Sequence, residues 1–81
     1  MTRTEIFDGL KEIIQTIKPK MNLDNVSEQS ALVTDLGIDS LSMLLLSLAT
    51  EQKFQIRFET QKPFERVSDV IDYIIGIRAD D

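Results

Sequence analysis

The sequence predicts an all-α fold, namely a small bundle of three main helices plus one short helix, with a long loop between the first and second helices. Apolar residues recur at helical spacing in three separate segments, and no alternating apolar run is long enough to build a sheet. The chain has 81 residues, which fits one domain covering residues 1–81. Its 42% hydrophobic and 28% charged residues are typical of a folded globular domain.

The first helix is predicted to begin at a capping box and to end before a proline. Thr2 and Glu5 have the spacing at which each side chain caps the other's backbone N–H. Pro19 ends the helix, because the residue before proline is pushed out of helical geometry. The apolar face of this helix comprises Ile6, Leu10, Ile13, Ile14 and Ile17.

Residues 20–38 read as a long loop, since they are rich in Asn, Asp and Ser. A loop of this length needs anchors of its own or a function. We expect its apolar residues to pin it across the bundle, with a short helical turn at residues 32–36. Gly37 is expected to allow a turn with positive φ. The anchoring candidates are Leu23, Val26, Leu32, Val33, Leu36 and Ile38.

The second helix is predicted over about residues 40–53, with Asp39 as the N-cap that accepts the first free backbone N–H groups. At about 100° per residue its apolar side chains separate into two arcs. One arc holds Leu41, Leu44, Leu45 and Leu48, and the other holds Met43, Leu46 and Phe54, with Thr50 between them. A helix apolar on two sides is either deeply buried or shares one side with a partner, and a domain this small cannot easily surround a helix. We expect Phe54 to be buried among the helices.

Phe54, Ile56 and Phe58 alternate as in a strand, but the run is too short to make a sheet. We predict a loop there, with the short helix near residues 59–62. The last helix is predicted to begin near Ser68 as its cap, and its Ile71 should be buried. The apolar face of this helix comprises Val70, Ile71, Ile74 and Ile75.

Composition excludes several classes of function. The net charge of −5 disfavours nucleic acid as a partner, because phosphate binding requires a basic face. The chain has no Cys and no His, so it lacks a thiol nucleophile, Cys ligands for a metal, and the usual general base. The first residues are too charged for a signal peptide, and no apolar run approaches the ~20 residues of a membrane span. We therefore expect a cytoplasmic monomer without a metal site.

Ser40 lies between Asp39 and the leucine-rich helix, and three readings of it are open. An enzyme nucleophile would need a base to take its proton, and Asp39 at a helix cap is a weak base. We therefore expect no catalytic activity. A cap alone would explain an Asp-Ser pair at a helix start. The third reading is a point of covalent attachment, which the surrounding motif favours.

The motif D-L-G-x-D-S-L occupies residues 35–41, after an amphipathic helix and a long loop and at the start of a leucine-rich helix. With "VIDYI" at residues 70–74, the whole pattern resembles the acyl carrier proteins over nearly the entire chain. The resemblance implies an acyl-carrier-like helical bundle. It also implies that a phosphopantetheinyl transferase attaches 4′-phosphopantetheine from coenzyme A to Ser40, with Asp39 and Leu41 as recognition neighbours.

The same resemblance implies that the chain carries acyl intermediates as thioesters for fatty-acid, polyketide or other specialised biosynthesis, between acyl-loading and acyl-processing enzymes. It implies that the arc with Leu41, Leu44 and Leu48 is the exposed partner face and that the opposite arc faces the core. To these partner-binding residues we add Leu45, on the same arc, and Glu51. Carriers of primary fatty-acid synthesis commonly have acids at the positions of Ser42 and Leu45, so uncharged residues there indicate a dedicated pathway. Ile38-Asp39 in place of Gly-His favours an acyl over a peptidyl carrier.

Two alternatives remain open. The chain could be an aminoacyl or peptidyl carrier loaded by an adenylating ligase. It could also be an unmodified helical adaptor that binds partners through the leucine arc.

Overall fold

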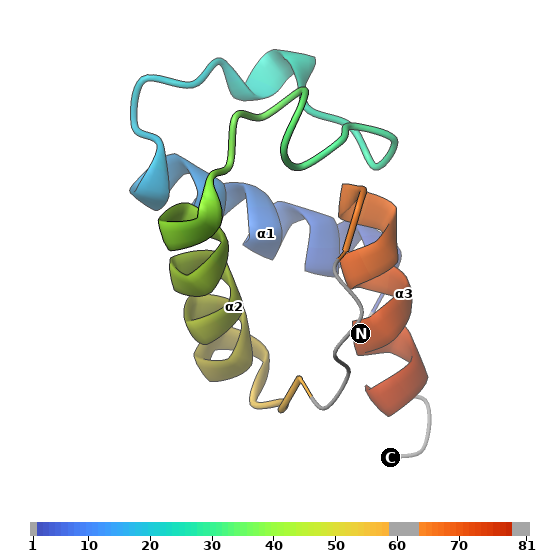
Figure 1. Cartoon of the computed structure of the whole chain (residues 1–81). Helices are drawn as coiled ribbons and strands as arrows, with labels where there is room; N and C mark the ends of the chain where they lie inside the picture. The colour runs from blue at the N-terminus through green and yellow to red at the C-terminus, as the bar shows by residue number, and fades with distance from the viewer. Residues whose placement is uncertain (1, 59–63, 79–81) are drawn as a thin grey trace.

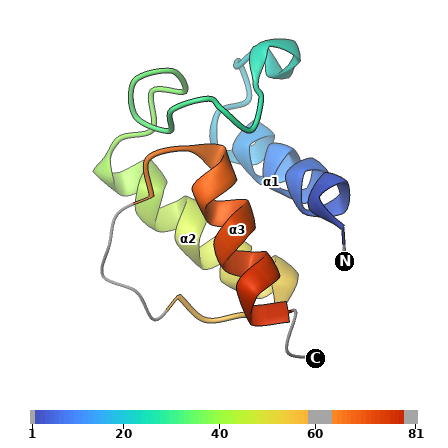
Figure 2. The same ribbon diagram turned by 90° about the vertical axis from the view of Figure 1, so that its right-hand side faces the viewer.

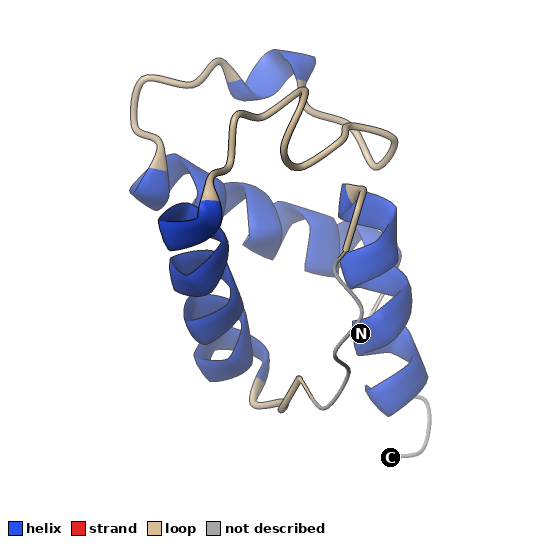
Figure 3. Cartoon of the chain, in the orientation of Figure 1, coloured by secondary structure: helices blue, strands red, loops and turns tan. Residues whose placement is uncertain are grey.

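The computed structural model describes residues 2–58 and 64–78, which form three α-helices and one short 3₁₀ helix. In chain order these are α1 (Arg3–Ile17), η1 (Leu23–Asn25), α2 (Ser40–Phe54) and α3 (Val67–Arg78). Figure 1 shows α1 crossing behind α2 and α3, and Figure 2, turned by 90°, shows α1 to one side of them; in both views the long loop runs over one end of the bundle. No strand occurs in the described residues (Figure 3). The predicted bundle is thus confirmed, whereas the short helix expected at residues 59–62 lies outside the described residues.

The first helix begins and ends as its sequence predicts. The Thr2 hydroxyl accepts the Glu5 N–H at 3.1 Å, and the Glu5 carboxylate accepts the Thr2 N–H at 3.1 Å. Lys18, directly before Pro19, is the C-cap. The predicted apolar face of α1 supplies much of the core: Ile6, Leu10, Ile13 and Ile14 are buried, and Ile17 packs against them.

The contact between α1 and α2 depends on a missing side chain at Gly9. A Cβ atom there would lie 2.7 Å from Cζ of Phe54 and 3.0 Å from Cε of Lys53. The Phe54 ring, at the last residue of α2, therefore lies directly against the backbone of α1, and Phe54 is buried as predicted. Lys53 closes the same contact from outside, since its ammonium group lies 2.8 Å from the Glu12 carboxylate.

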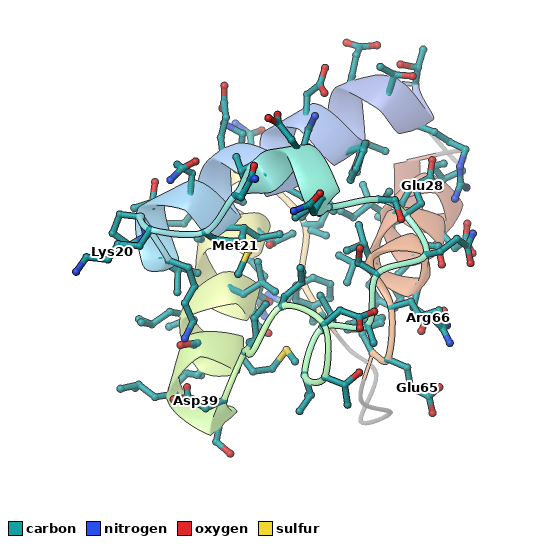
Figure 4. All side chains as sticks on the ribbon, turned by 90° about the horizontal axis from the view of Figure 1, so that it is seen from above. Lys20, Met21, Glu28, Asp39, Glu65 and Arg66 are labelled. Carbon is teal, nitrogen blue, oxygen red and sulfur yellow. The ribbon has the colours of Figure 1, made fainter. Side chains whose placement is uncertain are left out.

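Backbone hydrogen bonds attach the long loop to the start of α3. The carbonyls of Ser30 and Glu28 accept the first N–H groups of α3, those of Val67 at 3.1 Å and Ser68 at 2.8 Å. In return, the Leu32 N–H donates to the Glu65 carbonyl at 2.8 Å. Figure 4 shows Glu28, Glu65 and Arg66 gathered at this junction. Four of the predicted anchors in the loop have buried side chains, namely Val26, Leu32, Leu36 and Ile38.

The prediction that Ser68 caps the last helix is wrong, because α3 begins at Val67 and Ser68 lies in its first turn. The helix starts one residue earlier than predicted, so its first amides are those of Val67 and Ser68, and loop carbonyls distant in sequence accept them. The Asp69 carboxylate braces the entry to the helix, accepting the N–H groups of Glu65 and Arg66 at 3.0 Å each. Ile71 is fully buried, as expected.

The turn expected at residues 32–36 is confirmed. The N–H groups of Asp35 and Leu36 donate to the Ala31 carbonyl, and the Asp35 carboxylate accepts the Ala31 N–H at 2.7 Å. Gly37 follows with φ = 64°, the positive value predicted for it. The 3₁₀ helix η1 was not predicted. It begins where the Asn22 side chain accepts the Asp24 N–H at 3.0 Å.

Two further contacts hold the outer parts of the fold. Arg3 bridges Glu28 of the loop and Asp72 of α3, which ties the first residue of α1 to both. Three aromatic rings, those of Phe58, Phe64 and Tyr73, contact one another with centroids 5.3–5.7 Å apart. Within the described ranges, none of the helices has both the length and the apolar character that a bilayer span requires.

Gly9→Ala and Gly76→Ala should shift stability in opposite directions. Ala gains up to about 1 kcal/mol over Gly in a helix, but overpacking costs about 1–3 kcal/mol. At Gly9 the Phe54 ring blocks the new methyl group, so urea denaturation should show a less stable protein. At Gly76, apart from the adjacent residues and the backbone of α3 itself, no described atom lies within 4 Å of the added Cβ, so that variant should be more stable. Equal stabilisation by both would show that the ring does not press on α1.

Phe54→Ala should leave the domain largely unfolded or molten by circular dichroism. Truncating a buried Phe costs about 3–5 kcal/mol, a large share of the roughly 5–15 kcal/mol that stabilises a domain. A near-native melting temperature would contradict the packing of α2 on α1.

Candidate functional site

Ser40 is the first residue of α2, and its side chain is exposed. Asp39 is the N-cap, as predicted: its carboxylate accepts the Ser42 N–H and its carbonyl accepts the Met43 N–H, each at 2.8 Å. Figure 4 shows Asp39 at the free end of α2, on the far side of the molecule from Glu28 and Arg66. The site therefore lies away from the junction between the loop and α3.

The residues just before the site fix its position. Ile38 is buried, and its N–H donates to the Leu32 carbonyl at 3.0 Å. Gly37 turns the chain with its positive φ, so that the two residues after Ile38 emerge into solvent. A buried anchor directly before an exposed pair gives Ser40 a defined place without covering it.

The chemistry of Asp39 argues against an activated serine. The Ser42 backbone N–H and hydroxyl, followed by the positive charge of Lys18, lower the pKa of the Asp39 carboxyl group. Hydrogen bonds to the ionised form stabilise that form, so the carboxylate is a poorer proton acceptor than an ordinary Asp. Asp39 holds the helix end and does not serve as a base for Ser40.

The start of α2 can receive an anion. Within the described residues, the N–H groups of Ser40 and Leu41 have no hydrogen-bond partner, as expected for the first turn of a helix. Such amides, together with the positive end of the helix dipole, favour a negative group. A phosphodiester on the Ser40 hydroxyl oxygen would lie next to them, so the residues present fit a phosphate-linked cofactor.

The two predicted arcs of α2 differ in burial as expected. We call the outer arc the leucine face; it comprises Leu41, Leu44, Leu45 and Leu48, which are 66%, 55%, 45% and 52% exposed. On the inner arc, Leu46, Thr50 and Phe54 are buried and Met43 is half-buried. No charged residue occurs between Asp39 and Glu51, so the leucine face is apolar over most of the helix.

The leucine face continues into an open recess at the far end of α2. Glu51, predicted as a partner-binding residue, is half-buried there, and its carboxylate accepts the Phe58 N–H at 2.8 Å. This structural role was not visible in the sequence, because the two residues lie seven positions apart without a local motif. The recess is lined by Leu45, Leu48, Ala49, Glu51, Gln52, Ile56 and Arg57.

The structure adds Val33 and Met43 to the surroundings of Ser40. Val33, predicted as one of the buried loop anchors, is 60% exposed, so that expectation is wrong. Its loop closes through the backbone, and its side chain turns to the surface beside the start of α2. The sequence pattern gave no signal for this, because Val33 is apolar like the buried anchors around it.

The sequence model of the family described as "Phosphopantetheine attachment site" matches residues 8–74. The chain is 38% identical over 71 residues to the acyl carrier protein of Clostridium perfringens (strain SM101 / Type A), an alignment covering 85% of this chain and 92% of that protein. It is 40% identical over 72 residues to the acyl carrier protein of Thermobifida fusca, with 86% and 90% covered. It is 36% identical over 75 residues to the meromycolate extension acyl carrier protein of Mycolicibacterium smegmatis, with 90% and 75% covered.

The range matched by the family model spans Asp39, Ser40 and the whole of α2. The chain therefore belongs to the acyl carrier protein family, whose members are carriers and not enzymes and hold 4′-phosphopantetheine covalently.

Proposed function

We propose that the chain carries acyl intermediates as thioesters on a 4′-phosphopantetheine arm attached to Ser40, for fatty-acid, polyketide or other specialised acyl biosynthesis. The observation that carries the proposal is the exposed Ser40 hydroxyl at the start of α2, beside two backbone amides without partners in the described residues. Asp39 and Leu41, both exposed, flank Ser40 and are the proposed recognition neighbours for the transferase.

In the proposed attachment reaction, this chain supplies the nucleophilic oxygen and the transferase supplies the base. The Ser40 hydroxyl oxygen forms a bond to the pantetheine-bearing phosphorus of coenzyme A, the pyrophosphate linkage breaks, and the nucleotide part leaves. The proton of the hydroxyl must go to a base of the transferase, because the chain has no His and Asp39 is held in the cap. The carrier contributes an accessible oxygen and amides that stabilise the new phosphodiester.

The leucine face is the proposed docking surface for the acyl-processing enzymes. It begins at Leu41, next to the attachment residue, and it has no charged side chain between Asp39 and Glu51. Exposed apolar patches of this kind mark interaction sites. An uncharged surface gives little attraction to a basic enzyme surface, which supports a dedicated partner whose docking site is itself apolar.

Ser40→Ala should abolish attachment. Incubated with a broad-specificity transferase, magnesium and coenzyme A, the wild-type protein should gain the mass of one phosphopantetheine, and Ser40→Ala should gain none. Ser42→Ala, two residues further along the same helix, is the matched control and should still be modified. A mass gain in Ser40→Ala would place attachment at another serine, and a wild-type protein that stays unmodified would favour an unmodified adaptor.

Leu45→Glu should change partner choice without unfolding the protein. Leu45 is 45% exposed, so the free energy of unfolding should stay within ~0.5 kcal/mol of wild type. The new charge should weaken docking to an apolar partner and improve recognition by basic fatty-acid synthase enzymes, measured by their turnover of the loaded carrier.

Leu46→Glu is the buried comparison for this experiment. Leu46 is 4% exposed, and an unpaired carboxylate there should destabilise the domain strongly. A large drop in melting temperature for Leu45→Glu would contradict the exposed leucine face, and unchanged turnover by basic enzymes would contradict its role in partner choice.

A further inference from the structure

A second apolar surface adjoins Ser40, on the side of α2 away from the leucine face. It is an open recess lined by Val33, Ile38, Asp39, Ser40 and Met43. Val33 comes from the loop and half-buried Met43 comes from the inner arc of α2, while buried Ile38 lies between them in the chain. The attachment residue is thus itself part of the recess wall.

The loop wall of this recess is held in place by its own backbone. The Val33 carbonyl accepts the Gly37 N–H at 3.1 Å, and the Leu32 carbonyl accepts the Ile38 N–H at 3.0 Å. The Asp35 carboxylate closes the turn by accepting the Ala31 N–H at 2.7 Å. Val33 nevertheless remains 60% exposed, whereas Leu32 on one side is buried. The fold therefore holds an apolar side chain at the surface next to Ser40.

The arm that the family carries has a matching apolar group close to its attachment point. Beyond the phosphate and one methylene, its next carbon bears two methyl groups. That carbon is separated from the Ser40 oxygen by only a few bonds, so it must lie close to Ser40. There it can contact the recess, contact the leucine face, or remain in water. The recess offers apolar walls on two sides, and the outer side of a helix offers one. Met43 is unbranched and can adapt its shape to a ligand.

We propose that the recess between Val33 and Met43 binds the dimethyl-bearing part of the phosphopantetheine arm, which would then leave Ser40 on the loop side of α2. The proposal rests on the proposed attachment at Ser40. The phosphate and the dimethyl group find separate partners: the phosphate meets the free N–H groups of Ser40 and Leu41, and the methyl groups meet the recess. An arm bound in this way leaves the leucine face uncovered for a partner enzyme.

Nuclear magnetic resonance of the arm-loaded protein tests the proposal. Intact mass first establishes that the sample is fully loaded, so a failed attachment is recognised before docking is measured. The arm's dimethyl protons should then show nuclear Overhauser effects to the methyl groups of Val33 and Met43. Effects to Leu41 and Leu44 in their place would overturn the proposal, because the arm would lie on the leucine face. A fully loaded sample without effects to any of the four would overturn it as well.

Matched variants give a second measurement. Val33→Ser removes one wall of the recess, and Leu44→Ser removes a side chain of similar exposure, 55%, from the leucine face. Val33→Ser should move the relaxation of the dimethyl group towards that of free coenzyme A, and Leu44→Ser should leave it unchanged. The unloaded variants serve as folding controls through their amide spectra. Equal effects of the two substitutions, or none from Val33→Ser, would contradict docking in the recess.

Discussion

The junction between the long loop and α3 is the constraint on which the position of the attachment site depends. Loop carbonyls at Glu28 and Ser30 accept the first amides of α3, and Leu32 returns a hydrogen bond to Glu65. The loop has no regular structure over most of its length, yet this junction holds its middle, and the burial of Leu36 and Ile38 holds its end before α2. Ser40 therefore occupies a defined place on the surface, at the start of a helix whose other end is packed on α1.

The small size of the domain also leaves α2 with two different faces. One face packs on α1 through Leu46 and Phe54, and Gly9 allows the Phe54 ring to approach the α1 backbone. With so few residues, the domain cannot cover the opposite face, and the leucine face remains in solvent. Attachment chemistry at one end of α2 and a partner surface along its side thus arise from a single helix.

Signals that are local in the sequence predicted much of this structure. The capping box of Thr2 and Glu5, the cap at Asp39, the positive φ of Gly37 and the two arcs of α2 each depend on residues within a few positions of one another. The features that could not be predicted depend on contacts between distant segments. The start of α3 at Val67 depends on carbonyls of the distant loop, which accept its first amides, and Val33 could not be distinguished from buried neighbours of the same character.

The leucine face also has a consequence for the protein in the absence of any partner. Four adjacent exposed leucines would favour association between copies at high concentration. The chain carries a net charge of −5, while the face itself carries none, so the repulsion between copies must come from acidic residues elsewhere on the surface. The acidic surface thus keeps the protein soluble, while the leucine face provides the docking surface. Since salt screens the repulsion but leaves the apolar attraction in place, the colloidal stability of the free carrier should depend on ionic strength more than its folding does.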